Sequence, residues 1–418
     1  MFFKINEVFK ILIIVAMLTI SVFSIGKINI ENNLDYVASV FFKQSITTNE
    51  LVQKFEKTDS RTFININKKN IKKEDKIKIM IVPGHDGNNS GAVFNGTKEA
   101  DLNLKLAKKI NSILEVQEEF DVHLSRDDNG YNPKLKKFLE NEEGILNFRK
   151  EKVEIMEDLI KKEKVSSYVN VQHNFAPSEV VTILYGINKY SNDNNFDIVL
   201  HIHFNDYPGR SGTSGKYSGF SIYVPEKQYS NSEASYEFAN SLKKQLELFL
   251  PISNLPKESA ITESQELIAI GSYNTSDAIS VLVEYGYIYE SQFHNELIQE
   301  EFFDEMAVQT YWGIRNYLKE QKVKKEIFSN LRDYKFNKKL NKGDKGVDVL
   351  ALQVFLNSRG HYPPEGESMN NCPMTGFFGN CTKKSLQEYQ RNNKIKESGI
   401  LDSDTINTIK PDYLFDMI

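Results

Sequence analysis

The chain has little cysteine and no excess of positive charge. Its 418 residues include two cysteines, and 52 Lys and Arg residues are outnumbered by 57 Asp and Glu residues. The net charge of −5 gives no electrostatic reason to expect a nucleic-acid partner, because such partners require a basic face. With 40% hydrophobic and 26% charged residues, the chain has the composition of a globular protein, and it is long enough for one large core and a second, smaller one.

The two cysteines, Cys372 and Cys381, lie close together in the last part of the chain. Outside the cytosol such a pair is able to form a disulfide that braces a loop, whereas in the cytosol it would be reduced or would bind a metal. We expect a disulfide between them if the chain is exported.

The N-terminus carries a basic and then an apolar segment. Lys4 and Lys10 are followed by an almost wholly apolar run from Ile11 to Gly26, which is the pattern of a secretory signal. Because the run lacks a clean cleavage site and approaches the length that spans a bilayer, residues 1–28 are predicted to be a signal peptide or a retained signal anchor. A buried core helix is the alternative. We expect an exported protein of the cell envelope, in the periplasm or on the outer face of the cytoplasmic membrane, either membrane-anchored or secreted.

Composition and pattern divide the rest of the chain into segments. These are a tether (29–75), an α/β catalytic domain (76–320) that contains a charged helical insertion (127–175), a linker (321–338) and a small helical domain (339–411). The insertion is dense in Lys and Glu with interspersed apolar residues, which predicts one or two solvent-exposed helices. It is either a lid over the site or a surface insertion with no role there.

Strands and helices alternate in the predicted catalytic domain. Lys76–Val82 is predicted to be a strand, and Thr97 is expected to cap a helix that ends near Ile113, because apolar residues recur there at helical spacing. Two further amphipathic helices are predicted over 234–250 and 295–318. This alternation predicts an α/β fold with a mostly parallel sheet flanked by helices.

Polar side chains occur where three apolar strands give way to loops. His85 follows the first strand within a Gly-flanked turn, and Glu284 interrupts the last. His201, His203 and Asn205 share one face of the middle strand, because side chains alternate between faces. A lone strand histidine is often a hydrogen-bonded core residue, and this is the alternative for His201. The carboxyl ends of parallel strands, however, lie at one edge of the sheet, where side chains from separate strands come close together. We therefore expect these side chains to meet.

Glu99 completes a candidate zinc site. It lies in the first turn of the helix that follows His85, where the helix dipole alone would also favour a carboxylate. His85, Glu99 and His203 would leave the fourth position of a tetrahedral Zn²⁺ open to water. An unpaired carboxylate buried in an apolar strand is costly, so we expect Glu284 at the end of its strand beside a partner, which the metal site supplies. We predict that Glu284 acts as general acid and base; a structural salt bridge is the alternative.

These residues lie in four motifs that resemble those of zinc-dependent N-acetylmuramoyl-L-alanine amidases of the AmiC and CwlV type. The motifs are Pro83–Gly87 with Ser90–Ala92, Lys98–Leu104, His201–Asn205 and Val281–Tyr287. The resemblance implies a phosphorylase/hydrolase-like fold. It also implies that His85, Glu99 and His203 hold zinc and that Glu284 is the catalytic glutamate.

Members of that family cleave the amide between the lactyl group of N-acetylmuramic acid and the first L-alanine of the stem peptide. Some carry a helical insertion that occludes the zinc until a protein activator withdraws it, and segment 127–175 is a candidate for such a gate. The chain departs from the usual family pattern at Val82, His201 and Phe204. His201 and Asn205 are expected to contact the substrate or to support the zinc ligands.

A second resemblance covers the C-terminal part. Leu340–Gln353, Gly376–Thr382, Leu386–Gln390 and Gly399–Thr405 are similar to the three-helix peptidoglycan-binding domain. A core of Leu350, Val354, Leu386, Tyr389 and Ile406 is predicted there from helical spacing. The alternative is a helical module that binds another protein or nothing.

The sequence thus predicts an exported zinc amidase that acts on peptidoglycan in cell-wall remodelling or lysis, with a membrane anchor and a protein activator as further candidate partners. Two alternatives stay open. One is a zinc peptidase or carboxypeptidase that cuts within the stem peptide. The other is a catalytically inactive wall-binding scaffold.

Overall fold

The structure is a computed structural model that describes residues 76–167, 178–207, 210, 215–318, 330–332 and 334–409. The predicted signal segment (1–28), the tether (29–75) and most of the linker (321–338) lie outside the described residues. Within the described part, no helix combines the length and apolar character that crossing a bilayer requires.

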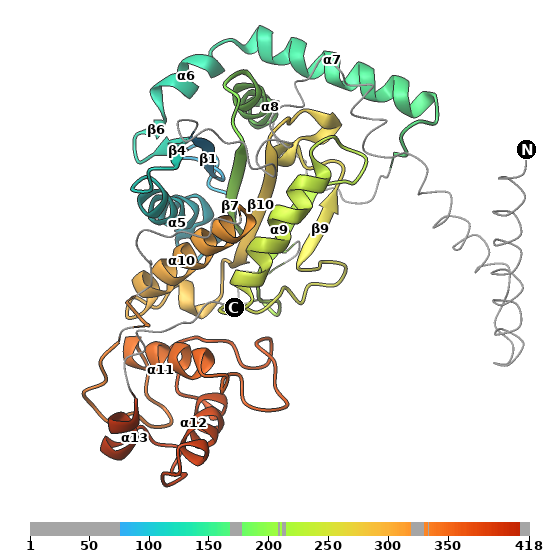
Figure 1. Ribbon diagram of the computed structural model, residues 1–418. Helices are drawn as coiled ribbons and strands as arrows, with labels where there is room; N and C mark the ends of the chain where they lie inside the picture. The colour runs from blue at the N-terminus through green and yellow to red at the C-terminus, as the bar shows by residue number, and fades with distance from the viewer. Residues whose placement is uncertain are drawn as a thin grey trace, which may run out of the picture. The chain divides into compact units, whose positions relative to one another are not determined.

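A six-stranded sheet forms the centre of the N-terminal part (Figure 1). Its strands, in spatial order, are β4 (Phe120–Leu124), β1 (Ile77–Pro83), β7 (Ile198–Asn205), β10 (Ile279–Tyr287), β8 (Ser221–Pro225) and β9 (Ile261–Ser264). The first four are mutually parallel, β8 runs antiparallel to β10, and β9 runs parallel to β8. The central strands are almost wholly apolar because both faces are covered. The predicted mostly parallel α/β sheet is confirmed.

Helices cover both faces of the sheet, and the alternation along β1 shows how. Ile79 and Ile81 belong to the core that includes α5 (Glu99–Leu114), whereas Met80 and Val82 pack in the cluster that includes α8 (Ser178–Asp193). The helices α9 (Ser232–Leu246) and α10 (Gln299–Leu318) pack on each other, and α10 also packs on α5. Because side chains alternate between the two faces of a strand, those of β1 pack against two separate helical layers.

The start of α5 differs from the prediction. Thr97 is not the cap: Thr97–Lys98 forms a short strand, β3, that pairs with β2 (Val93–Phe94), and α5 begins at Glu99 without a side-chain cap. Because Thr97 and Lys98 are paired in this hairpin, they are not part of the helix. As a result Glu99 is the first helical residue, where the positive end of the helix dipole favours its carboxylate.

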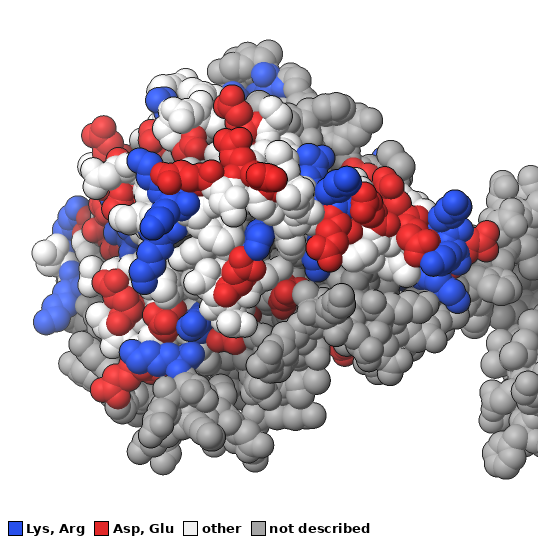
Figure 2. Space-filling view, turned by 90° about the horizontal axis from the view of Figure 1, so that it is seen from above, with Lys and Arg blue, Asp and Glu red and all other residues white. Residues whose placement is uncertain are grey.

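The predicted charged insertion contains α6 (Pro133–Leu139) and α7 (Glu142–Lys161), which follow the short strands β5 (Arg126–Asp127) and β6 (Gly130–Tyr131). One face of α7 is buried, because Ile145 packs against Tyr185 of α8 and Ile268. On the face shown in Figure 2, Lys and Arg side chains are interspersed with Asp and Glu. The helices are thus charged outside and apolar inside.

The C-terminal part contains α11 (Val347–Ser358), α12 (Asn380–Asn392) and α13 (Ser403–Thr408). Of the predicted core residues, Leu350, Val354, Leu386 and Tyr389 are buried and Ile406 is partly buried. Cys372 and Cys381 form a disulfide.

Three short 3₁₀ helices of the N-terminal part, Ile268–Ile270, Ser272–Asn274 and Ser291–Phe293, complete the described elements.

Candidate metal centre

Three side chains from separate elements meet at the carboxyl edge of the sheet. His85 follows β1, His203 lies near the end of β7, and Glu99 begins α5. Glu99 Oε1 lies 2.9 Å from His203 Nδ1, and Glu99 Oε2 lies 3.1 Å from His85 Nε2. One ligand atom from each residue lies within 4.8 Å of the others. This group is able to hold a metal ion.

Two glycines allow the imidazoles to lie this close to the backbone. A Cβ atom on Gly84 would lie 2.1 Å from His203 Nε2, and one on Gly91 would lie 2.4 Å from Glu99 Oε2 and 2.5 Å from His85 Cδ2. His85 itself has a φ of 60°, a left-handed conformation that is uncommon outside glycine and typical of functional sites. The turn after β1 is therefore shaped around the side chains of the site.

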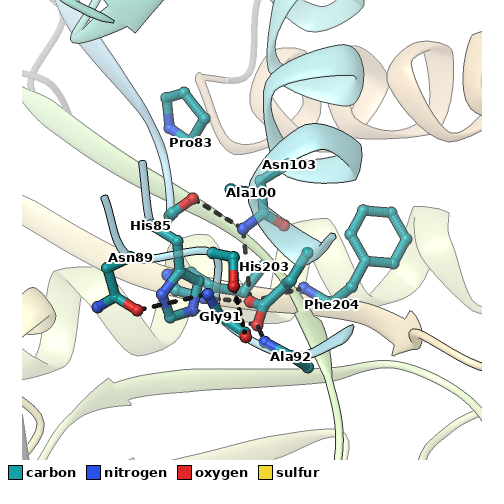
Figure 3. Close-up of polar contacts among 12 residues, drawn as sticks. Pro83, His85, Asn89, Gly91, Ala92, Ala100, Asn103, His203 and Phe204 are labelled. Carbon is teal, nitrogen blue, oxygen red and sulfur yellow. Dashed lines mark hydrogen bonds and ion pairs between the residues drawn. The ribbon is translucent and has the colours of Figure 1, made fainter. Parts of the chain in front are cut away.

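The Glu99 carboxylate is buried and held by the backbone as well as by the imidazoles. Its Oε2 accepts a hydrogen bond of 3.0 Å from the Ala92 N–H, and its Oε1 accepts one of 3.4 Å from the Phe204 N–H (Figure 3). Burial would raise the pKa of this carboxyl, but hydrogen bonds and charge from His203 and His85 outweigh it and hold the pKa well below its usual range. Glu99 is thus ionised, as a metal ligand must be.

Two residues that the sequence reasoning missed fix the turn that carries His85. Arg126 donates to the carbonyl oxygens of Pro83, at 3.2 Å, and of Gly84, at 2.9 Å. Asn103 also donates to the Gly84 carbonyl, at 2.9 Å, and Figure 3 shows it reaching the site from α5. A sequence signal existed for both. Asn103 lies one helical turn after Glu99, and Arg126 follows a strand of the same sheet edge.

His201 lies two residues before His203 on β7 and lines the same cavity, but it is not one of the three converging residues. It is 1% exposed, and among the described residues its Nε2 has no hydrogen-bond partner. Burial and, to a lesser extent, the charge of His203 lower the pKa of His201 to about 3, although a hydrogen bond with the Ala269 backbone opposes them. Burial also lowers the pKa of His203. For both imidazoles burial favours the neutral form, which is the form that binds metals.

Glu284 lies on β10 directly beside His203 in the parallel pairing of β10 with β7. Burial raises the pKa of its carboxyl well above the usual value, and the negative charges of Glu99 and Glu258 raise it further. Its Oε2 has no hydrogen-bond partner in the described part of the chain. A carboxyl with a raised pKa beside a cluster of candidate ligands is suited to accept and return a proton.

A cavity of about 450 Å³ connects these residues. Its polar wall is formed by His85, Glu99, His203, Asn205 and Glu284. Its apolar wall is formed by Val180, Ile183, Leu184 and Ile187 of α8. The site therefore accepts a group of mixed polar and apolar character beside the three converging side chains.

Comparison with known proteins identifies the families of two parts of the chain. Residues 79–316 match the sequence family described as N-acetylmuramoyl-L-alanine amidase. The chain belongs to this family. Residues 345–409 match the family described as putative peptidoglycan binding domain. Both resemblances found in the sequence motifs are thereby supported, the first over more than half of the chain.

Solved structures of amidases are similar to the amidase-family region at low identity. The N-acetylmuramoyl-L-alanine amidase from Clostridium difficile 630 is 19% identical, with 59% of this chain and 100% of that chain covered and a TM-score of 0.39. The catalytic domain of CwlV from Bacillus (Paenibacillus) polymyxa var. colistinus is 20% identical, with 58% and 98% covered and a TM-score of 0.38. An endolysin of Bacillus phage SPP1 is 52% identical over 44 residues, which are 10% of this chain and 16% of the endolysin's length.

Proposed function

We propose that the chain is a zinc-dependent N-acetylmuramoyl-L-alanine amidase that hydrolyses the amide between N-acetylmuramic acid and L-alanine in peptidoglycan. The observation that carries this proposal is the convergence of His85, Glu99 and His203 beside Glu284. This convergence occurs within the region that matches the amidase family.

The three converging residues fit a zinc ion. Two imidazoles and one carboxylate are a ligand set that zinc accepts in catalytic sites, with bonds of about 2.0–2.2 Å that place tetrahedral ligand atoms about 3.3–3.6 Å apart. The paired atoms lie 2.9 and 3.1 Å apart, so small side-chain shifts would admit the ion. His85, Glu99 and His203 would hold it. When bound, zinc supplies a Lewis acid that polarises a carbonyl and makes water more acidic.

Glu284 performs the proton transfers. As water adds to the scissile carbonyl carbon, the Glu284 carboxylate takes one of its protons. When the carbon–nitrogen bond breaks, the same carboxyl returns the proton to the leaving amine nitrogen, so that a carboxylic acid and a free amine result. Burial beside two other carboxylates raises the pKa of Glu284, which makes its carboxylate a stronger base in the first step and lets it hold the proton until the second.

The C-terminal helical domain, proposed as residues 339–411, would bind peptidoglycan. A catalytic domain tethered to the polymer meets its substrate at a raised effective concentration. A polymer substrate of the cell wall and the apolar N-terminal segment support a location outside the cytoplasm, with the protein either secreted or membrane-anchored.

Mass analysis of digested cell wall tests the proposal. Purified protein with added zinc should release intact stem peptides that begin with L-alanine, and a chelator should abolish the release. Shortened stems that remain attached to the glycan would instead identify a peptidase that cuts within the stem. Binding without any product would identify a scaffold.

A further inference from the structure

Glu258 lies just before β9 and is in no motif described above. Its carboxylate accepts hydrogen bonds from four side chains on three strands and one loop. Oε1 accepts from Asn205 Nδ2 at 3.2 Å and from the Tyr223 hydroxyl. Oε2 accepts from the Tyr287 hydroxyl at 3.1 Å and from the Ser253 hydroxyl. One acid thus ties together β7, β8, β10 and the segment before β9.

Two of these four donors reach the catalytic cavity. Asn205 and Tyr223 line it, whereas Ser253 and Tyr287 are not among its lining residues. Asn205 lies two residues beyond His203 on β7, which is about 6.6 Å along the strand. The charge of Glu258 is also felt by Glu284. Glu258 does not itself line the cavity, but its carboxylate holds two of the side chains that do.

The bond to Glu258 determines how the Asn205 amide is oriented. A carboxylate has only acceptor oxygens, so the donor nitrogen of the amide must face it, and the carbonyl oxygen must face the other way. Within the part of the chain that the structure describes, the side-chain hydrogen bond of Asn205 is made by Nδ2 and none is made by Oδ1. An acceptor oxygen with a fixed direction is therefore available at the cavity.

We propose that Glu258 is a positioning residue that holds the Asn205 amide with Oδ1 turned to the cavity, where Oδ1 accepts an amide N–H group of the substrate. The inference rests on the proposed peptidoglycan substrate. That polymer offers amide N–H groups from two sources, the acetamido group of the sugar and the stem peptide, and the chemistry of recognition is the same for both.

Binding of an intact muropeptide to the full chain tests the role of both residues without turnover. In a Glu284→Gln background, which keeps the substrate uncleaved, calorimetry with zinc present should give a Kd about five- to tenfold higher for Asn205→Ala and for Glu258→Gln, the loss expected for one neutral hydrogen bond. Glutamine offers both a donor and an acceptor, so it no longer dictates the orientation of Asn205.

Ser253→Ala is the matched control, because it removes a hydrogen bond to the same carboxylate but leaves the bond to Asn205. Its Kd should stay within about twofold of the parent. The double variant Asn205→Ala with Glu258→Gln should bind no more weakly than Asn205→Ala alone. Additive losses of about 25-fold or more, or an unchanged Kd for Asn205→Ala, would overturn the proposal.

Kinetics with Glu284 intact provide a readout that a purely structural role would not give. Asn205→Ala should raise KM about five- to tenfold and leave kcat within about threefold, because the negative charge of Glu258 near Glu284 is kept. A fall in kcat with unchanged KM would contradict the inference. Absence of hydrolysis by the parent, with these binding differences preserved, would refute the proposed function and not this inference.

Two substrate analogues distinguish the sources of the N–H group. One carries an acetoxy group in place of the sugar acetamido group, and the other carries an ester in place of the amide between the first two stem residues. The analogue that lacks the recognised N–H should bind equally well to the Glu284→Gln protein with and without Asn205→Ala. If Asn205→Ala weakens binding of both analogues as much as that of the natural substrate, Asn205 binds neither group and the proposal fails.

Discussion

Gly84→Ala should empty the metal site while leaving the fold intact. The added Cβ would lie 2.1 Å from Nε2, 2.2 Å from Cε1 and 2.7 Å from Cδ2 of His203. Carbon atoms in ordinary contact are about 3.5–4.0 Å apart, so the ring must retreat by more than 1 Å. The backbone has little freedom to move, because the Gly84 N–H donates to Ile202 and its carbonyl is held by Asn103 and Arg126.

The expected loss of metal affinity is large. Metal–ligand distances are defined to about 0.2 Å, and disturbing even the partners of a ligand costs about 10–100-fold in affinity. We expect zinc affinity to fall at least about 100-fold in Gly84→Ala, measured by competition with a chromophoric chelator. Gly87→Ala in the same turn is the control, because its Cβ would meet nothing within 4 Å. Equal zinc affinity in the two variants would refute the account of this turn.

Three further predictions follow from buried groups and from the disulfide. Glu284→Gln should lower the hydrolysis rate about 10²–10⁴-fold with unchanged zinc content, and an unchanged rate would remove Glu284 from the mechanism. Burial raises the pKa of Asp277 from 3.8 to about 6, so folding stability is lost as pH rises through this window. The unfolding free energy of Asp277→Asn minus that of the parent, measured with denaturant, should therefore be up to about 3 kcal/mol higher at pH 7 than at pH 4. A difference that does not change with pH would contradict this. Replacing Cys372 and Cys381, nine positions apart, by serine should lower the unfolding free energy of the C-terminal domain by about 2–3 kcal/mol. Hydrolysis of soluble muropeptides by this variant should be unchanged, and an unaltered thermal transition would count against a stabilising disulfide.

The sheet could be predicted because its strands carry their own signal. Runs such as Ile79–Val82 are apolar on both faces, and polar residues appear where the strands end. The carboxyl ends of parallel strands lie at one edge of the sheet, and this rule was enough to predict that His85 and His203 lie close together. The start of α5 was predicted wrongly, because Thr97 is a good cap by type but pairs in a hairpin instead. The pairing of Thr97–Lys98 with Val93–Phe94 thus overrode the preference of threonine for the helix cap.

Partners distant in sequence were beyond prediction. Arg126 reaches the carbonyl of Pro83 across 43 positions, and Glu258 reaches Asn205 across 53. Neither pair has a periodic pattern in the sequence, because a hydrogen bond between elements that are distant in sequence depends on how whole elements pack. The orientation of Asn205 is likewise set by a residue that no motif contains.

The central claim is that His85, Glu99 and His203 hold one zinc ion. Anomalous diffraction at the zinc edge, from crystals of the protein purified without chelator, tests it most directly. The account predicts one strong peak at about 2.0–2.2 Å from a ligand atom of each of the three residues. A peak bound elsewhere, or no metal in a preparation that hydrolyses peptidoglycan, would contradict it.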